Sequence, residues 1–321
     1  MNKPTVLVHN DRFEDLVDAV RGAHPDIAVE GCGTYEDLPE AIEQTAPEIV
    51  YSICFGGRAG FPRGPLLNSP SVKWISVGGS GTDHLLPWDA AKLTVTNSAG
   101  VAADMMAEYA IGALLYFSLN LPRFLRAKSN REWVSGRVEP LEGKTVLILG
   151  LGRTGCAVAR RAKALGMKTI GVRARPAPTE NVDEVFGADK LPGLWQRADA
   201  LVVAVPLLDS TRGLVSSDTF ANLKPGSIIV DISRGGVTNQ TALEEALASG
   251  HLRGAALDVF ETEPLPQDSP LWAMENVIVT PHCSSVYDGW GMKSVAMFCE
   301  NLTRYRNERP LLNVVDPIRG Y

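Results

Sequence analysis

A glycine-rich turn between two apolar runs, within residues 144–175, constrains the fold more than any other stretch of the sequence. The run Thr145–Leu149 is short, apolar and partly β-branched, which is typical of a strand buried on both faces of a parallel sheet. Three closely spaced glycines follow it. A helix is then predicted over residues 154–165, which Gly166 ends, and a second strand over residues 169–172.

The three glycines are Gly150, Gly152 and Gly155, a G-x-G-x-x-G pattern between a predicted strand and a predicted helix. In that context the first glycine permits the turn, the second lets the backbone approach a pyrophosphate, and the third lets the helix pack closely on the strand. The helix N-terminus offers free N–H groups and a positive dipole end to the phosphates. The pattern predicts a dinucleotide site, and an ordinary glycine-rich turn is the alternative.

The composition excludes several classes of partner. A chain of 321 residues suggests two domains, and its 45% hydrophobic and 21% charged residues are typical of a soluble globular protein. A net charge of -6 disfavours binding to nucleic acid or to an anionic membrane. The N-terminus leads straight into a predicted strand, without the pattern of an export signal. We therefore expect a cytoplasmic protein.

The cysteines are scattered and form no C-x-x-C pair, which favours reduced thiols over a disulfide framework or a zinc site, so no metal is predicted. They are Cys32, Cys54, Cys156, Cys283 and Cys299.

Before the glycine turn, short apolar runs alternate with helical stretches, which predicts a parallel sheet with helical crossovers. The predicted strands are 5–9, 27–30, 49–53, 74–77 and 93–96, with helices at 13–23 and 36–44 and a surface loop at 54–64. The longest apolar helical stretch, residues 102–125, is expected to be buried, since its apolar part is too short to span a bilayer.

The same rhythm continues after the glycine turn. Strands are predicted at 200–205, 227–232, 255–259 and 277–280, with helices at 241–249 and 287–307. Because the dinucleotide unit lies in mid-chain, everything before it must form a separate domain.

Three charged or titratable residues follow three successive predicted strands: Arg234, Glu263 and His282. The carboxyl edge of an open α/β sheet is where ligands bind, so all three are expected near a bound nicotinamide. Each also has a simpler explanation, as a surface arginine, a loop charge and a buried histidine. Their joint placement beside a dinucleotide unit favours function.

Hydride transfer to a 2-oxo acid requires what these residues offer. The carbonyl oxygen becomes an alkoxide and needs a proton, which His282 can hold and give near neutral pH. A carboxylate at the other ring nitrogen, Glu263, fixes the tautomer and favours the imidazolium form. Arg234 supplies a fork of donors to the substrate carboxylate.

The runs GLGRTG, DISRGG, ALDVFETEPLP and NVIVTPHCSS resemble the D-isomer-specific 2-hydroxyacid dehydrogenase family. The spacings of 29 positions from Arg234 to Glu263 and 19 from Glu263 to His282 also match. VGGSGTDHL and TNSAGVAADMMAEYA extend the likeness over most of the chain.

The resemblance implies an α/β fold of two doubly wound parallel-sheet domains. A Rossmann nucleotide domain, residues 99–288, would be inserted into a flavodoxin-like substrate domain made of residues 1–98 and 289–321. The helix from Ala102 belongs to the segment through which members usually dimerise, so a homodimer through the nucleotide domain is expected. Trp133 resembles a position that in some reductases reaches the neighbouring subunit's active site, and a buried packing Trp is the alternative.

The resemblance also implies individual site residues. Ser80 and Gly81 would be backbone donors to the substrate carboxylate, Asp258 would meet the nicotinamide carboxamide, and Ile232 to Arg234 would form part of the nicotinamide wall. The whole predicted cofactor site comprises Gly150, Gly152, Arg153, Thr154, Gly155, Arg173, Arg175, Val205, Pro206, Ile232, Ser233, Asp258, His282 and Ser284.

One departure from the family pattern concerns the cofactor. The family commonly has Asp at the end of the second strand to hold the ribose hydroxyls, and Arg173 takes that place, 23 positions after Gly150. An acid would repel a 2′-phosphate, whereas Arg173, with Arg175, would pair with it. NADP(H) is therefore predicted, with NAD(H) possible; two exposed loop arginines are the alternative. Cys283 has no role that follows from the sequence.

The sequence therefore predicts NADPH-dependent reduction of a small 2-oxo acid, glyoxylate or hydroxypyruvate, to the D-2-hydroxy acid. Oxidation of formate is disfavoured, because the resembling formate enzymes carry Gln where this chain has Glu263. NAD-linked oxidation of a larger acid such as phosphoglycerate is an alternative, which the ending at Tyr321, without a regulatory domain, and the missing ribose acid disfavour. A nucleotide-sensing corepressor or scaffold is another, although no extended disordered tail is expected.

Overall fold

The computed structural model describes residues 3–53 and 60–320, and the chain divides into two compact units. The first unit is Met1–Val101 with Tyr287–Tyr321, and the second is Ala102–Val286. The predicted domain boundaries, 98/99 and 288/289, lie close to these divisions.

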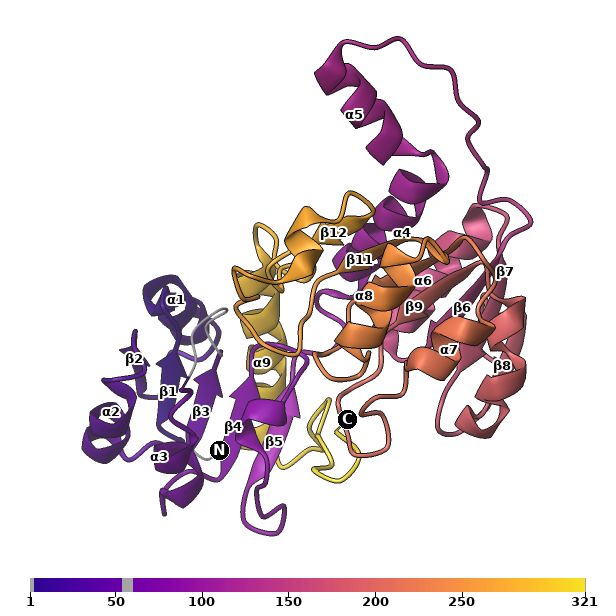
Figure 1. Cartoon of the computed structure of the whole chain (residues 1–321). Coiled ribbons are helices and arrows are strands. Elements are labelled where there is room, and N and C mark those ends of the chain that lie inside the picture. Colours follow the sequence, from indigo (N-terminus) through magenta and orange to yellow (C-terminus); the bar gives the residue numbers. More distant parts are fainter. Residues whose placement is uncertain (1–2, 54–59, 321) are drawn as a thin grey trace. The chain divides into compact units, whose positions relative to one another are not determined.

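The first unit is a parallel sheet covered by helices on both faces (Figure 1). Its described residues form five strands in the order β2-β1-β3-β4-β5, the flavodoxin-like order. Its strands are β1 Val6–His9, β2 Val29–Cys32, β3 Ile49–Ser52, β4 Trp74–Val77 and β5 Thr94–Asn97; its helices are α1 Phe13–Ala23, α2 Leu38–Thr45, α3 Arg63–Asn68, α9 Trp290–Arg306 and the short η1 Asp83–Leu85.

The two ends of the chain meet in this unit. Helix α9 places Val295, Phe298 and Leu302 in the core cluster that also contains Trp74 of β4. In addition, the hydroxyl of Tyr51 in β3 donates to Oγ of Ser294 in α9 at 2.8 Å. The C-terminal helix therefore completes a unit that the N-terminal residues begin.

The second unit, all of whose residues are described, holds seven parallel strands in the order β12-β11-β10-β9-β6-β7-β8. This is the Rossmann order with a further strand at one edge. Its strands are β6 Thr145–Leu149, β7 Lys168–Val172, β8 Glu184–Phe186, β9 Ala200–Val203, β10 Ser227–Asp231, β11 Leu252–Leu257 and β12 Val277–Val279; its helices are α4 Ala103–Ser118, α5 Leu121–Asn130, α6 Arg153–Ala164, α7 Ser217–Asn222, α8 Gln240–Ala248 and the short η2 Ala188–Gly193, η3 Trp195–Arg197 and η4 Pro270–Ala273.

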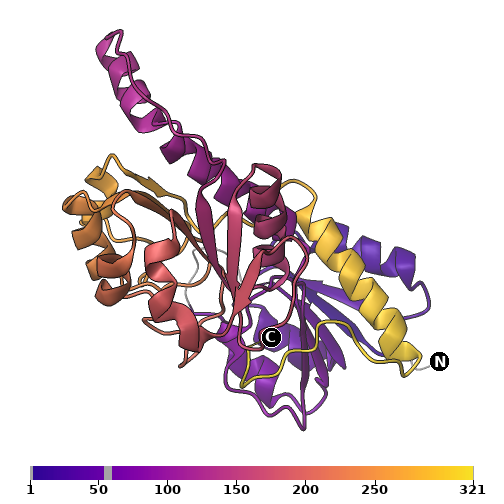
Figure 2. The ribbon, with the colours of Figure 1, turned by 90° about the vertical axis from the view of Figure 1, so that its right-hand side faces the viewer.

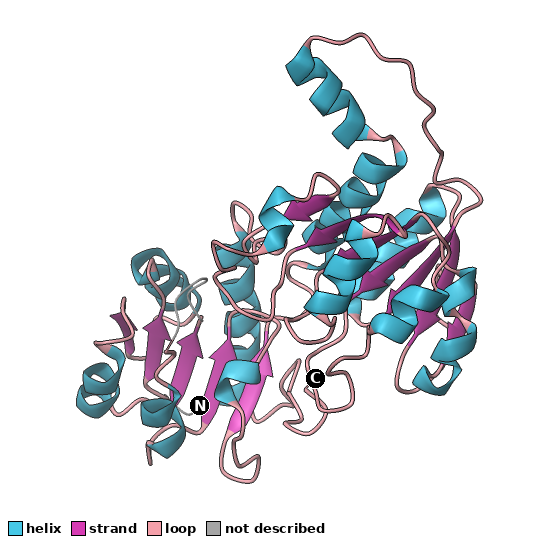
Figure 3. Ribbon diagram, in the orientation of Figure 1, coloured by secondary structure: helices cyan, strands magenta, loops and turns pink. Residues whose placement is uncertain are grey.

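Helices cover both faces of this sheet (Figure 3). Helices α4 and α6 bury one face, and α7 and α8 bury the other. Successive side chains of a strand point to opposite faces, so Val146 and Ile148 of β6 join one core cluster while Leu147 and Leu149 join the other. This explains why the strand is a continuous apolar run.

The predicted long helix from Ala102 is broken in two. Helix α4 ends at Ser118, Asn120 has a left-handed φ of 56°, and α5 begins at Leu121 with Pro122 in its first turn. A proline has no N–H with which to continue the helix before it, so the prediction of one continuous helix here was wrong.

Helix α5 and the segment that returns from it, residues 131–138, form an arm that projects away from the sheet of the second unit (Figures 1 and 2). The arm exposes apolar side chains, among them Leu121, Leu125 and Val138. Trp133 is 103% exposed, so the alternative of a Trp packed inside its own chain is wrong.

Several smaller elements were not predicted, including the edge strand β8 and the six-residue helices α3 and α7. Most of the loop predicted at residues 54–64, including Cys54, lies outside the described residues, and α3 begins at Arg63. In the described residues, every helix is too short or too polar to cross a membrane.

Candidate active site

The glycine turn lies where the strand order of the seven-stranded sheet changes direction, because β6 has β7 on one side and β9 on the other. In open α/β sheets ligands bind outside the carboxyl ends of the strands at this point. Every predicted residue of the second unit's site follows the carboxyl end of a strand or belongs to α6.

The three glycines differ in what surrounds them. Gly150 has φ 95°, and a Cβ there would lie 2.5 Å from the carbonyl oxygen of Ala204. A Cβ at Gly155 would collide with the carbonyl oxygen of Gly150. By contrast, a Cβ at Gly152 would have no atom within 4 Å apart from those of its own local backbone and chain neighbours. This open space at the start of α6 fits a pyrophosphate that accepts from backbone N–H groups.

Arg173 directly follows β7, and its N–H donates to the carbonyl oxygen of Phe186 in β8 at 3.0 Å. The first turn of α6 contains Arg153, Thr154 and Cys156. Burial raises the pKa of the Cys156 thiol, and the charge of Arg173 opposes that rise, so this charge lies near the first turn. Arg173 is partly exposed and Arg175 is exposed. Both guanidinium groups are accessible to an anion.

Arg234 lies in a tight turn after β10. Gly235, next to it, approaches the next loop so closely that a Cβ would collide with the carbonyl of Phe260. The turn is held by Asp231, whose Oδ1 accepts from Ser233 N at 2.9 Å and Ser233 Oγ at 2.5 Å, and whose Oδ2 accepts from Thr238 Oγ1 at 2.6 Å. Burial raises the pKa of Asp231, and these hydrogen bonds oppose it.

Asp231 was not among the predicted site residues. An aspartate followed two residues later by serine at the end of a strand is the signal for an Asx turn, and that signal is present in the DISRGG run.

His282 and Glu263 form a hydrogen-bonded pair, with Nδ1 of the ring 2.9 Å from Glu263 Oε2. The other carboxylate oxygen accepts from the N–H of Phe260 at 3.0 Å. Burial opposes ionisation of Glu263, but the hydrogen bonds from His282 and Phe260 and the charges of His282 and Arg234 outweigh it, so the pKa of Glu263 is lowered. The structure therefore brings Arg234, Glu263 and His282 together as an ionised carboxylate, an imidazole and a guanidinium.

Asp258 is buried and accepts three hydrogen bonds. Its Oδ1 accepts from Thr280 Oγ1 at 2.6 Å and Cys283 N at 2.8 Å, and its Oδ2 accepts from Ser284 N at 2.9 Å. Of these bonds, Oδ2 accepts only the one from Ser284 N. Within the described residues, the buried hydroxyl of Ser284 has no hydrogen-bond partner, which fits a polar ligand group.

The remaining predicted cofactor residues lie after neighbouring strands. Val205 and Pro206 follow β9 and are partly exposed, whereas Ile232 and Ser233 follow β10 and are buried.

Ser80 and Gly81 belong to the first unit, in the loop that follows β4. The loop is tied to β5, since Asn97 Nδ2 donates to the carbonyl of Ser80 at 2.7 Å and Ser98 N donates to that of Gly79 at 2.8 Å. Ser80 is exposed.

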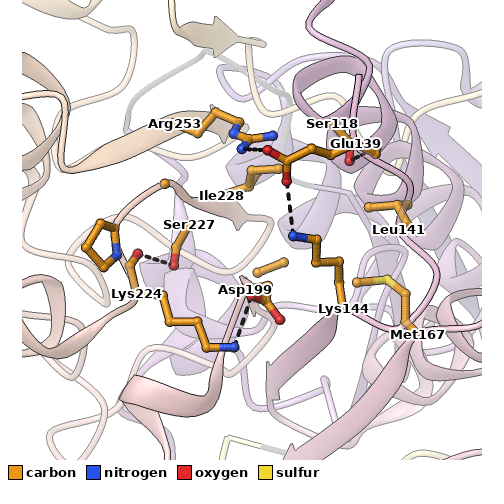
Figure 4. Close-up of a pocket in the computed structure, with 13 residues that line it drawn as sticks. Ser118, Glu139, Leu141, Lys144, Met167, Asp199, Lys224, Ser227, Ile228 and Arg253 are labelled. Carbon is orange, nitrogen blue, oxygen red and sulfur yellow. Dashed lines mark hydrogen bonds and ion pairs between the residues drawn. The ribbon is translucent and has the colours of Figure 1, made fainter. Parts of the chain in front are cut away.

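A cavity of about 250 Å³ lies at the opposite, amino edge of the seven-stranded sheet (Figure 4). Its charged side chains are paired with one another: Glu139 with Lys144 at 3.0 Å and Arg253 at 2.5 Å, and Lys224 with Asp199 at 3.0 Å. None of the predicted site residues lines this cavity.

A dinucleotide turn at the switch point and an imidazole–carboxylate pair beside an arginine define a nicotinamide-dependent dehydrogenase of the Rossmann class. The sequence profile described as "D-isomer specific 2-hydroxyacid dehydrogenase, NAD binding domain" matches residues 111–284. The chain belongs to the D-isomer-specific 2-hydroxyacid dehydrogenase family, whose enzymes depend on NAD(P).

Individual relatives differ in their substrates. D-3-phosphoglycerate dehydrogenase of Methanocaldococcus jannaschii is 37% identical over 284 residues, which span 86% of this chain and 52% of that protein. The chain thus spans about half of that relative. A D-isomer specific 2-hydroxyacid dehydrogenase of Xanthobacter autotrophicus Py2, solved with NADPH and MES, is 32% identical with a TM-score of 0.86 over 100% of both chains. The NADPH-dependent glyoxylate/hydroxypyruvate reductase of Sinorhizobium meliloti, solved with NADP and sulfate, is 27% identical with a TM-score of 0.83, covering 99% of this chain and 100% of that one.

Proposed function

We propose that this protein reduces a small 2-oxo acid, glyoxylate or hydroxypyruvate, to the D-2-hydroxy acid with NADPH. The observation that carries the proposal is the 2.9 Å hydrogen bond between His282 and Glu263, at the sheet edge where Arg234 also lies. The cofactor would supply the hydride, and the protein's own residues would bind the acid and move the proton.

In this proposal His282 gives a proton to the carbonyl oxygen of the substrate. With its Nδ1 proton donated to Glu263, the ring presents Nε2 as the atom that exchanges a proton with the substrate. Glu263 has a lowered pKa and stays ionised at neutral pH, so it stabilises the imidazolium that must form before transfer. The reverse reaction would use the same pair, with His282 as base.

Arg234 would hold the substrate carboxylate by charge-assisted hydrogen bonds, together with the backbone N–H groups of Ser80 and Gly81. A planar guanidinium and a carboxylate make two parallel bonds, which fixes the carbonyl carbon in one orientation. Within the first unit, the hydrogen bond from Asn97 to the carbonyl of Ser80 holds the loop that contains Ser80.

The cofactor preference rests on Arg173, with Arg175 beside it. A 2′-phosphate would gain charge-assisted hydrogen bonds from these groups, whereas the ribose hydroxyls of NADH would find no carboxylate at that position. The relatives from Xanthobacter autotrophicus and Sinorhizobium meliloti, which were solved with NADPH or NADP, support this preference.

Steady-state rates with glyoxylate, hydroxypyruvate and D-3-phosphoglycerate, each with both cofactors, test the proposal. We expect NADPH-dependent reduction of the two small acids and a KM for NADPH at least about tenfold below that for NADH. Arg173→Ala should remove that preference. Lys168→Ala, which deletes an exposed charge at the other end of the same strand, should leave it intact.

Faster oxidation of D-3-phosphoglycerate with NAD would favour the activity of the Methanocaldococcus jannaschii relative instead. An unchanged cofactor preference in Arg173→Ala would remove the basis for NADPH.

We also propose that two copies associate through the nucleotide-binding unit. The arm exposes Leu121 at 38%, Leu125 at 52% and Trp133 at 103%, a set of apolar side chains that a partner would bury. Light scattering should give twice the chain's mass, and the double variant Leu121→Ser/Leu125→Ser should give a monomer. Trp272→Ala, which changes an exposed Trp elsewhere in the same unit, is the control and should not alter the mass.

A further inference from the structure

The turn that carries His282 has an unfavourable backbone conformation. His282 has φ 51°, in the left-handed region that residues with a side chain rarely adopt, and its N–H donates to the carbonyl of Thr280 at 3.0 Å. Contacts from outside the turn must therefore hold it in place.

Those contacts converge on Thr280, the residue that opens the turn. Thr280 Oγ1 lies 2.6 Å from Asp258 Oδ1 and 2.9 Å from the hydroxyl oxygen of Tyr109 in α4. A threonine hydroxyl has one proton, which Thr280 donates to Asp258 Oδ1, so Thr280 accepts from Tyr109. The hydrogen bonds thus run in one direction, from Tyr109 in α4 through Thr280 to Asp258. Asp258 also accepts from Cys283 N and Ser284 N.

This chain of hydrogen bonds is sheltered from water. Asp258 is 1% exposed, Tyr109 is partly buried, and burial raises the pKa of Tyr109 to about 12, so its hydroxyl remains a donor over the working range of pH. In a site with little water, a lost hydrogen bond is not replaced by solvent.

We propose that Tyr109 and Thr280 are positioning residues for His282: through Asp258 they hold the turn that presents the imidazole to Glu263. The inference rests on the proposed role of His282 as proton donor. Neither Tyr109 nor Thr280 needs to touch the substrate, since both act through the backbone on either side of His282.

Two substitutions at Thr280 separate the hydroxyl from the shape of the side chain. Thr280→Val keeps the branched shape and removes the hydroxyl, and we expect it to lower kcat about tenfold or more by misplacing His282, with both KM values within about twofold. Thr280→Ser keeps the hydroxyl and should restore kcat to within about twofold of the wild type.

Tyr109→Phe should lower kcat by a smaller factor, about threefold, since Thr280 can still donate to Asp258. The double variant Tyr109→Phe/Thr280→Val should be no slower than Thr280→Val alone, because the two groups act through one chain. Tyr116→Phe, on the same helix, is the matched control and should be unaffected.

Hydrogen exchange measures how well the amides of this turn are protected, and it does not require turnover. The amides of Cys283 and Ser284 should exchange about tenfold faster in Thr280→Val and recover in Thr280→Ser. Unchanged exchange in Thr280→Val, an equal loss of kcat in Thr280→Ser, or multiplying effects in the double variant would each overturn the inference. A wild type that reduces no 2-oxo acid, with exchange responding as expected, would overturn the proposed function but not the role of the chain in holding the turn.

Discussion

Two buried aspartates hold the two turns that carry Arg234 and His282, and they do so differently. Asp231 accepts from Ser233 and Thr238, which lie within seven positions of it. Asp258 accepts from residues 22 to 26 positions later, beyond the neighbouring strand β12. The first turn is closed within itself, whereas the second is completed only when β11 and β12 have paired.

The groups that donate to the two aspartates also differ in whether they can rotate. One oxygen of Asp231 is bound only by the hydroxyl of Thr238, which can rotate to accept instead of donate. Both oxygens of Asp258 are bound by backbone N–H groups, which cannot rotate. The turn of the proton donor therefore needs two accepting oxygens at Asp258 more strictly than the turn of Arg234 needs them at Asp231.

The largest effect is expected at His282, in the turn that Asp258 holds. His282→Ala should lower kcat for glyoxylate by about 10²–10⁴-fold, the usual contribution of a positioned acid or base, while the Kd of NADPH stays nearly unchanged. His251→Ala is the control, because His251 bonds the carbonyl of Leu223 near the amino edge of the same sheet. Turnover that survives His282→Ala would remove His282 from the proposed chemistry.

The next effect compares the aspartates directly. In Asp258→Asn one amide NH₂ must face a backbone N–H, and we expect a loss of about 1–3 kcal/mol in the free energy of unfolding, as for a buried unsatisfied group. In Asp231→Asn the new NH₂ can face Thr238, whose hydroxyl turns to accept, so the loss should be less than about 1 kcal/mol. Urea unfolding of both variants measures the difference.

Equal losses in the two variants would show that the kind of donor does not distinguish the turns. A larger loss in Asp231→Asn would reverse the comparison.

Arg234→Lys tests the residue carried by the turn that Asp231 holds. Lysine keeps the charge but not the planar fork, so we expect the KM for glyoxylate to rise about tenfold, with a smaller change in kcat. The KM for NADPH should not move. A fall in kcat with an unchanged KM would mean that Arg234 acts on the reaction step rather than on substrate binding.

The difference between the turns also explains what the sequence could predict. The glycine turn and the position of Arg234 follow from short runs of neighbouring residues. The parallel pairing of the strands was expected from the alternation of predicted strands and helices, whereas the strand orders come from the structure. The pairing of Glu263 with His282 was expected from chemistry and family spacing, and the structure gives its distance.

Contacts that depend on packing were beyond the sequence. Nothing near Thr280 in the chain indicates that its hydroxyl meets Tyr109, 171 positions earlier, because that contact exists only after α4 has packed on the sheet. The break between α4 and α5 was missed although Pro122 signals it, since the apolar pattern continues across the break.

The smallest effect is expected at the amino edge of the sheet, where the carboxylates are accessible to water. Glu139 is held by Arg253 and Lys144 but its side chain is 44% exposed, so the pair should contribute less than about 1 kcal/mol. The hydrogen bond from Arg253, then that from Lys144, lowers the pKa of Glu139 below its ordinary 4.5. Its contribution is therefore present above pH 4.5 and is lost as the pH falls through the lowered pKa.

Glu139→Gln should accordingly lower Tm slightly at pH 7, by less as the pH falls below about 4, and by less again in high salt. Glu275→Gln, which breaks a more exposed pair with Arg126, is the control and should have still less effect. If Glu139→Gln cost as much as Asp258→Asn and were insensitive to salt, burial would not be what separates the two edges. A small, salt-sensitive loss of stability in Glu139→Gln would show that the carboxylates whose replacement costs most lie at the carboxyl edge of this sheet, where the proposed chemistry needs rigid turns.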